Sequence, residues 1–138
     1  MQEYLKNGSD TEKAVAQKAD LLWKGVEWNW YTKSQDALYW YWSPNFGFEK
    51  NLKRTGYNEV LITYILAAAS PNFSITKPAY EKGWASSGGI VSSASQYGFP
   101  LVLNHAGGSN FGGPLFFSHY SFLGLNPKNL SDQYGNYW

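Results

Sequence analysis

An apolar segment, Val60-Leu-Ile-Thr-Tyr-Ile-Leu-Ala-Ala-Ala69, constrains the fold of this chain more than any other feature. It is apolar on nearly every side of a helix, and a helix without a polar face lies inside a protein. Ser70-Pro71 ends it, because the residue before a proline disfavours helical backbone. The sequence therefore predicts a helix surrounded by protein, with Asn58 and Glu59 in its first turn. The segment is too short to span a membrane, which takes roughly 18 apolar residues.

A second helix is predicted over residues 10–29. Ser9 and Glu12 mark its start, because they have the spacing of a capping box. Apolar residues then recur at helical spacing, namely Val15, Ala19, Leu22, Trp23, Val26 and Trp30. We expect an amphipathic helix that buries this one stripe.

The region after this helix differs from it in composition. Residues 37–42 are rich in β-forming side chains, and residues 43–47 form a turn cluster. We expect either a short hairpin, with a return strand that begins at Phe48, or a long ordered loop.

The C-terminal half alternates short elements with long loops. Short helices are predicted at about residues 78–86, with Pro78 in the first turn, and at about 114–124. Between them, residues 86–113 are predicted as a Gly-rich loop that contains a short strand at 99–103. The predicted class is therefore mainly α, with about four or five helices and long aromatic- and Gly-rich loops.

Aromatic residues make up 19% of the chain, against 15% for charged residues. Seven Trp are more than a core of this size needs. Flat amphipathic rings suit ligands with an apolar face and a polar edge, such as sugars, so we expect part of this surface to line a cleft. The composition fits an aromatic-rich core equally well, and it leaves both interpretations open.

Composition and spacing argue against several other functions. A net charge of +1 gives no extended positive potential that would bind nucleic acid or an anionic membrane. The absence of Cys excludes thiol catalysis and Cys-based zinc sites, and His105 and His119 alone make a poor metal site. The loop Gly107-Gly-Ser-Asn-Phe111 lacks the last Gly of a nucleophile elbow, and no Lys-Ser/Thr pair follows it. We expect no metal, no cofactor, no nucleic acid and no membrane partner.

Glycoside hydrolysis is the chemistry that the acidic residues leave open. It needs two carboxylates that flank the scissile bond. Most acids here lie in charged stretches, whereas Glu59 follows Tyr57 and Asn58 at the head of the apolar helix. Glu59 either belongs to a site or merely favours the positive end of a helix, an effect of about 0.3–1 kcal/mol. No second acid of the same character is present.

Five motifs spread over most of the chain add a resemblance to these observations. They are Trp28-x-Trp30, Tyr41-Trp-Ser-Pro-Asn-Phe-Gly-Phe48, Gly56-Tyr-Asn-Glu-Val-Leu-Ile-Thr-Tyr-Ile-Leu-Ala-Ala-Ala-Ser-Pro71, Tyr80 to Trp84 and Gly113-Pro-Leu-Phe-Phe-Ser-His-Tyr120. Together they resemble the bacterial glucoamylase-like family. The match runs through nearly the whole chain from about Leu21, and the Gly-Tyr-Asn-Glu helix with its aromatic turn upstream is the most specific part.

The resemblance implies an (α/α)6 toroid, in which six inner and six outer helices surround a central cleft. It also implies a glycoside hydrolase that acts on β-glucan with inversion, since β-1,2-glucan hydrolases and sophorose-releasing enzymes are among the relatives. Twelve helices with their loops need roughly 200 residues. The resemblance places an acidic segment before Met1 and further helices after Trp138. We therefore expect residues 1–138 to be an incomplete piece of one toroid domain, inactive alone.

The resemblance also implies site residues. Glu59 matches the glutamate of the Gly-Tyr-Asn-Glu motif and is expected to be a catalytic acid or a direct substrate ligand. The expected substrate-binding residues are Trp42, Phe46, Tyr57, Asn58, His119 and Tyr120, and the expected partner is an oligosaccharide or polysaccharide. The parent is expected to be periplasmic or secreted, although MQEYLKNGSD shows no signal peptide.

Two other functions stay open beside this one. The chain can be a carbohydrate-binding piece without turnover, because one carboxylate cannot complete the acid/base pair. It can also be a purely structural helical fragment, in which the aromatic residues form the core.

Overall fold

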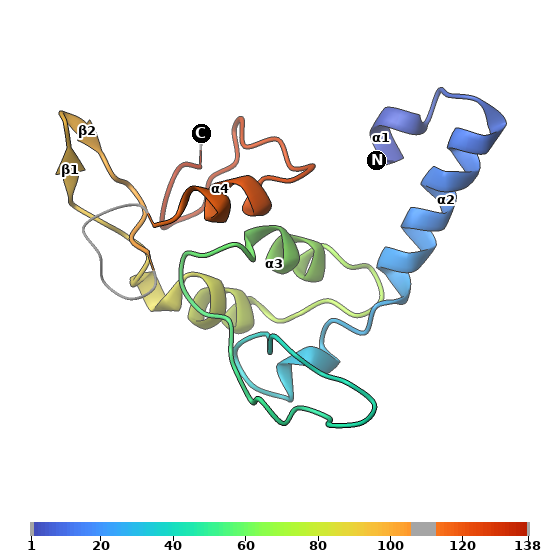
Figure 1. The fold of residues 1–138 in the computed structure, drawn as a ribbon, viewed down its shortest axis with the longest axis horizontal. Coiled ribbons are helices and arrows are strands. Elements are labelled where there is room, and N and C mark those ends of the chain that lie inside the picture. Colours follow the sequence, from blue (N-terminus) through green and yellow to red (C-terminus); the bar gives the residue numbers. More distant parts are fainter. Residues whose placement is uncertain (1, 106–112, 138) are drawn as a thin grey trace.

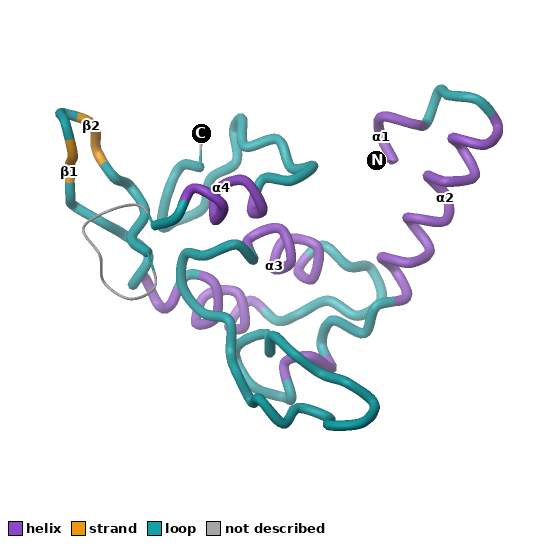
Figure 2. Tube along the Cα trace, in the orientation of Figure 1, coloured by secondary structure: helices purple, strands orange, loops and turns teal. Residues whose placement is uncertain are grey.

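The computed structural model describes residues 2–105 and 113–137, which are mainly helical with long loops (Figures 1 and 2). The helices are α1 (Gln2–Leu5), α2 (Asp10–Gly25), the 3-10 helix η1 (Trp30–Thr32), α3 (Leu61–Ala68), the π-helix η2 (Ala79–Trp84), the 3-10 helix η3 (Ser86–Gly88) and α4 (Leu115–Ser121). Strands β1 (Ser95–Gln96) and β2 (Phe99–Pro100) pair antiparallel. The predicted mainly helical class is confirmed. Within the described ranges, no helix is long and apolar enough to cross a bilayer.

Helix α2 projects away from the rest of the chain (Figure 1). Its capping box forms as predicted, because the Ser9 hydroxyl accepts from the Glu12 N–H and the Glu12 carboxylate accepts from the Ser9 N–H at 2.7 Å. The helix ends at Gly25, earlier than predicted. Val26 takes extended backbone, with φ −75° and ψ 123°, which cannot continue a helix.

The apolar sides of α2 and α3 are less buried than the sequence predicts. Val15 and Leu22, two members of the predicted buried stripe, are 45% and 62% exposed, so the prediction that α2 buries this stripe is wrong. Helix α3 buries one face, formed by Leu61, Tyr64 and Ala67. Leu66, on another side of α3, is 37% exposed. The prediction of a helix surrounded by protein therefore holds on one face only.

The segment between η1 and α3 is an ordered loop that pairs back on itself. The Trp40 N–H donates to the Leu52 carbonyl at 2.9 Å, but no regular strand forms there among the described residues. Of the two predicted forms, the ordered loop is the one observed. A return strand does not begin at Phe48, because the Asn51 N–H closes a turn onto the Phe48 carbonyl at 2.8 Å.

The C-terminal half keeps the predicted order with shorter elements. Helix η2 covers most of the helix predicted at 78–86, and Pro78 lies in the helical turn at its start, with φ −54° and ψ −35°, as predicted. Helix α4 is shorter than the predicted 114–124, and β2 covers only the first two residues of the strand predicted at 99–103. Gly107, Gly108 and Gly112 of the predicted loop lie outside the described residues.

The core lies where α3 and η2 meet the C-terminal tail. Its largest fully buried side chains include Trp84, Tyr64, Leu61 and Ile90. Asp132 holds the tail in place, since its Oδ2 accepts from the hydroxyls of Tyr80 at 2.7 Å and Tyr137 at 2.9 Å. Burial raises the pKa of Tyr137 to about 12. The hydrogen bond from Tyr80 to Asp132 thus joins the tail to η2, and the bond from Tyr137 to Asp132 lies within the tail.

Candidate functional site

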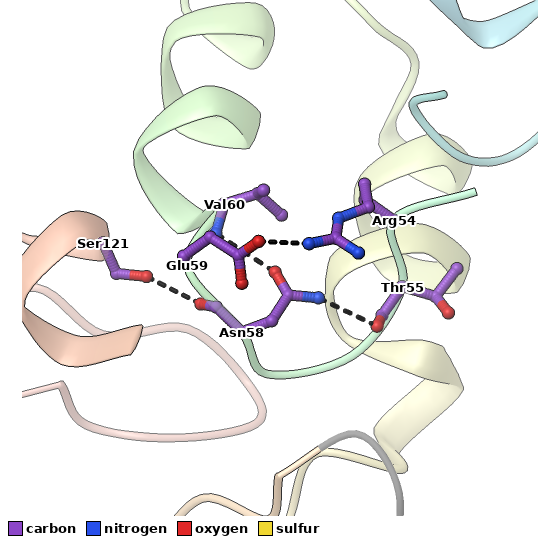
Figure 3. Close-up of polar contacts among 6 residues, drawn as sticks. All are labelled: Arg54, Thr55, Asn58, Glu59, Val60 and Ser121. Atoms are coloured by element: carbon purple, nitrogen blue, oxygen red, sulfur yellow. Dashed lines mark hydrogen bonds and ion pairs between the residues drawn. The ribbon is translucent and has the colours of Figure 1, made fainter. Parts of the chain in front are cut away.

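Glu59 lies on a tight turn that leads into α3 (Figure 3). The Asn58 side chain closes this turn, because its carboxamide oxygen accepts from the Val60 N–H at 3.1 Å and its nitrogen donates to the Thr55 carbonyl at 3.1 Å. Gly56 starts the turn with φ +75°, a left-handed backbone that glycine adopts without steric cost. Helix α3 begins only after this turn. The prediction that Asn58 and Glu59 lie in its first turn is therefore wrong.

The Glu59 carboxylate forms an ion pair with the Arg54 guanidinium, through Oε1 and Nη2 (Figure 3). The two side chains are 24% and 25% exposed. They line a cavity of about 240 Å³, together with Leu38, Tyr39, Trp40, Val60, Thr63 and Tyr64. The Arg54 guanidinium carbon also lies 5.5 Å from the centroid of the Trp40 ring. A carboxylate, a guanidinium and an indole therefore share one hollow beside α3.

Tyr64 fixes the main chain that carries this pair. Its hydroxyl accepts from the Leu38 N–H at 2.9 Å and donates to the Arg54 carbonyl at 2.7 Å. The Arg54 N–H in turn donates to the Leu38 carbonyl at 2.9 Å. Tyr64 is fully buried, and this burial raises the pKa of its hydroxyl to about 12. The bridge therefore keeps its proton throughout the neutral range.

Tyr57 and Asn58, both predicted substrate ligands, are buried, with 6% of each residue exposed. The Tyr57 hydroxyl shares a 2.8 Å hydrogen bond with the Ser118 hydroxyl, and its ring meets Trp84 edge-on. Tyr57 lines a second cavity, of about 290 Å³, which reaches Tyr137. The Asn58 carboxamide is engaged with the main chain of its own turn. Both residues therefore support the site from within the fold.

The other four predicted substrate-binding residues line neither of these two cavities. Trp42 is 40% exposed and packs edge-on against Trp30, with ring centroids 5.4 Å apart. Phe46 is 62% exposed on the same loop. His119 and Tyr120 are exposed on α4. These rings are accessible to a ligand from solvent, but the fold does not gather them around Glu59.

Sequence reasoning missed Arg54 and Trp40 as parts of the Glu59 cavity. A signal existed for Arg54, since a cation five residues before an acid comes within reach when a glycine turn separates them. No such signal existed for Trp40, because nothing in the aromatic run 39–42 indicates which ring turns toward Glu59.

In the described ranges, no three His, Asp or Glu side chains gather as metal ligands.

Residues 51–138, which include the whole Arg54–Glu59 turn, match the family model described as "Putative glucoamylase". The chain therefore belongs to this glucoamylase-like family, and the resemblance carried by its motifs is confirmed.

Three relatives illustrate the match. The exo beta-1,2-glucooligosaccharide sophorohydrolase (non-reducing end) of Parabacteroides distasonis is 39% identical over 99% of this chain and 21% of its own. The solved endo-beta-1,2-glucanase of Chitinophaga pinensis, in complex with sophorotriose and glucose, is 51% identical with a TM-score of 0.88, over 99% of this chain and 33% of that one. A solved beta-1,2-glucanase of Parabacteroides distasonis is 37% identical with a TM-score of 0.82, over 99% and 22%. The chain spans about a fifth to a third of the length of these relatives.

Proposed function

We propose that this chain is part of the catalytic toroid of a glycoside hydrolase that cleaves β-1,2-linked glucan. The observation that carries the proposal is the Glu59 carboxylate, which lies beside a guanidinium and an indole in a cavity at the entrance to α3. Relatives that are 37% to 51% identical are named for the hydrolysis of β-1,2-glucans. Residues 1–138 then supply one segment of the toroid, and a longer parent supplies the other helices.

The proposed chemistry is hydrolysis with inversion. One carboxylic acid protonates the departing glycosidic oxygen, while a second carboxylate about 6.5–9.5 Å away activates a water on the opposite face of the sugar. We assign the first role, or direct contact with the substrate, to Glu59. Among the described residues that line its cavity, Glu59 is the one carboxylate. We propose that the second member of the pair comes from the rest of the parent and that the 138-residue chain is inactive by itself.

The substrate contacts are proposed on the aromatic loop (residues 39–48), on the turn that carries Glu59 and on α4. Trp42 and Phe46 offer exposed ring faces that stack on glucose. His119 and Tyr120 offer exposed polar groups to sugar hydroxyls, while Tyr57 and Asn58 hold the turn that orients Glu59.

Substrate hydrolysis by the full-length parent tests this function. Reducing-sugar release is measured on β-1,2-glucan, a β-1,3-glucan and starch, and the anomer that forms first is read by proton NMR. We expect turnover of β-1,2-glucan with release of the α-anomer, since inversion converts a β-linkage to an α-product. Turnover confined to starch, or release of the β-anomer, contradicts the proposal.

A carbohydrate-binding function without turnover is the second candidate, and the lone carboxylate of the cavity favours it. Calorimetric titration of the full-length parent with β-1,2-linked oligosaccharides separates the two. Binding with no hydrolysis supports the second candidate, whereas the absence of both indicates a purely structural role.

A further inference from the structure

We propose that Arg54 is a positioning residue, which fixes the orientation of the Glu59 carboxylate inside its cavity. This inference rests on the proposed function of the Glu59 site. The direct contact is the ion pair between Arg54 Nη2 and Glu59 Oε1, which spans the turn that Asn58 closes (Figure 3). A carboxylate held by one partner presents its second oxygen to the cavity in a defined direction. Proton transfer to a glycosidic oxygen depends on that direction.

Arg54 is itself fixed by the protein core. Its main-chain N–H and carbonyl are both engaged, by Leu38 at 2.9 Å and by the buried Tyr64 hydroxyl at 2.7 Å. Its guanidinium lies 5.5 Å from the Trp40 ring centroid, in the range of a cation–π contact. Contacts with Tyr64 of α3 and with Trp40 of the aromatic loop thus hold Arg54 in place, and Arg54 in turn holds the Glu59 carboxylate. The pair is not formed by two flexible side chains in solvent.

The Arg54–Glu59 pair differs from the other ion pairs found among the described residues. Lys82 and Asp36 form a pair whose side chains are 59% and 47% exposed. Exposed pairs of that kind contribute little to stability because solvent screens them. The Arg54–Glu59 pair is the least exposed of those observed in the described ranges. Lys82 therefore offers a matched control, since it lies outside the Glu59 cavity.

One donor of the Arg54 guanidinium is unpaired beside this contact. Arg54 Nε is buried and has no hydrogen-bond partner among the described residues. An unpaired buried donor is unfavourable, and stability alone does not explain it. In this arrangement Nη2 contacts Glu59 and the guanidinium contacts Trp40, while Nε stays unpaired among the described residues. A lysine has neither the planar face nor the fork of donors, so we expect it to replace Arg54 poorly.

The test uses the full-length parent and β-1,2-glucan. Arg54→Gln is expected to lower kcat on the order of 10²-fold through misplacement of the reacting group, with KM nearly unchanged. Arg54→Lys is expected to recover little of that loss, whereas added guanidinium ion is expected to restore part of the rate of Arg54→Ala. Lys82→Gln is expected to leave kcat unchanged.

A double-variant cycle shows whether Arg54 acts through Glu59. The variant that combines Arg54→Gln with Glu59→Gln is expected to be no slower than Glu59→Gln alone, because residues that act as a unit are not additive. Additive losses, or a loss in Arg54→Gln that only follows a lower melting temperature, overturn the positioning role.

A readout that needs no turnover separates this inference from the proposed function. Inactivity of the wild type on β-1,2-glucan contradicts the function alone. The positioning role is then tested by carbodiimide labelling of carboxyl groups, followed by mass spectrometry. Labelling of Glu59 is expected to be about twofold or more faster in Arg54→Gln, because the ion pair no longer shields the carboxylate, while Glu81 labels as in the wild type. Equal labelling rates at Glu59 overturn the inference.

Discussion

The Ser121 hydroxyl donates a 2.8 Å hydrogen bond to the Asn58 carbonyl, and this contact joins the end of α4 to the turn that presents Glu59 (Figure 3). Ser121 is fully buried, and Asn58 is 6% exposed. The two residues are 63 positions apart in the sequence. The geometry around Glu59 therefore depends on tertiary packing between α4 and the turn, as well as on the local chemistry of the turn.

Ser121→Ala is expected to destabilise the protein by about 1–3 kcal/mol, because it leaves the buried Asn58 carbonyl without its donor. Urea denaturation of the full-length protein measures the difference. The exposed Ser74→Ala is the control and is expected to stay within about 0.5 kcal/mol of the wild type. If the two variants are equally stable, the hydrogen bond has no role in holding the turn.

Glu59→Gln in the full-length protein is expected to reduce turnover of β-1,2-glucan by about 10²–10⁴-fold, the usual contribution of a general acid. The amide has nearly the same shape but cannot donate or take up the catalytic proton. Initial rates measure the loss, and circular dichroism checks that the fold is intact.

An electrostatic explanation of Glu59 makes a different prediction. Glu59 precedes α3 instead of lying in its first turn, so an interaction with the helix dipole contributes less than about 1 kcal/mol. Unaltered turnover together with a slightly lower melting temperature in Glu59→Gln favours this explanation over the catalytic role.

The stability of the protein is expected to fall above pH 10, because burial raises the pKa of Tyr64 to about 12. The free tyrosine pKa is about 10, so below pH 10 the folded and unfolded chains both keep this proton and the contribution is fully present. Between pH 10 and 12 only the unfolded chain releases it, and stability falls by up to about 1.4 kcal/mol per pH unit for this group. Denaturation midpoints measured across this range test the expectation.

Tyr64→Phe is expected to reduce that pH dependence, since it removes the buried hydroxyl. It also lowers stability at neutral pH, because Leu38 and Arg54 lose their shared partner. Tyr97→Phe is the control, since Tyr97 is 96% exposed and its replacement should not alter the slope. An unchanged slope in Tyr64→Phe shows that the Tyr64 hydroxyl does not cause the alkaline loss.

Local chemistry explains which parts of the fold were predictable. The start of α2 followed from Ser9 and Glu12, whose side chains cap the helix with groups three residues apart. Its end did not follow, because the segment after Gly25 is shaped by distant contacts. One of them is the hydrogen bond from the Asn29 N–H to the Phe73 carbonyl at 3.2 Å, which no sequence pattern reports.

For the candidate site, too, local sequence singled out one residue but not its neighbours in space. Glu59 stood out because it follows Tyr57 and Asn58 at the head of an apolar segment, away from the charged stretches that hold most other acids. Its cavity partner Trp40 did not, because the pairing of Trp40 with Leu52 brings that ring near the turn. Residues adjacent in sequence thus singled out Glu59 as a candidate, whereas loop pairing over twelve residues decides what surrounds it.

The isolated 138-residue chain is expected to expose more surface than a stable monomer does. Its accessible surface is 9025 Å², whereas a folded monomer of 15.6 kDa has about 7,250 Å² by size scaling. Exposed leucines of α2 contribute to the excess, among them Leu22 at 62%. Such surface favours aggregation unless other helices cover it.

Leu22→Lys distinguishes an exposed α2 in the isolated chain from an α2 that other helices cover in the full-length protein. It is expected to reduce aggregation and dye binding of the isolated chain, and to destabilise the full-length protein by about 2 kcal/mol or more if other helices cover α2. Light scattering and thermal denaturation measure the two effects. A monomeric isolated chain with a cooperative thermal transition contradicts the expectation that these residues need the rest of a toroid.

Trp42→Ala is expected to weaken binding of a β-1,2-linked oligosaccharide by the full-length protein about tenfold or more, which corresponds to about 1.4 kcal/mol. Trp42 is 40% exposed, so removal of its ring costs less stability than truncation of a core residue, and we expect a loss below about 2 kcal/mol. Trp84→Ala is the contrast, since Trp84 is fully buried and its loss should cost about 3–5 kcal/mol. Calorimetric titration and urea denaturation give the two quantities for each variant. A large loss of stability in Trp42→Ala, with unchanged affinity per folded molecule, assigns Trp42 to the packing against Trp30 and leaves the sugar platform to Trp40, the indole that lines the Glu59 cavity.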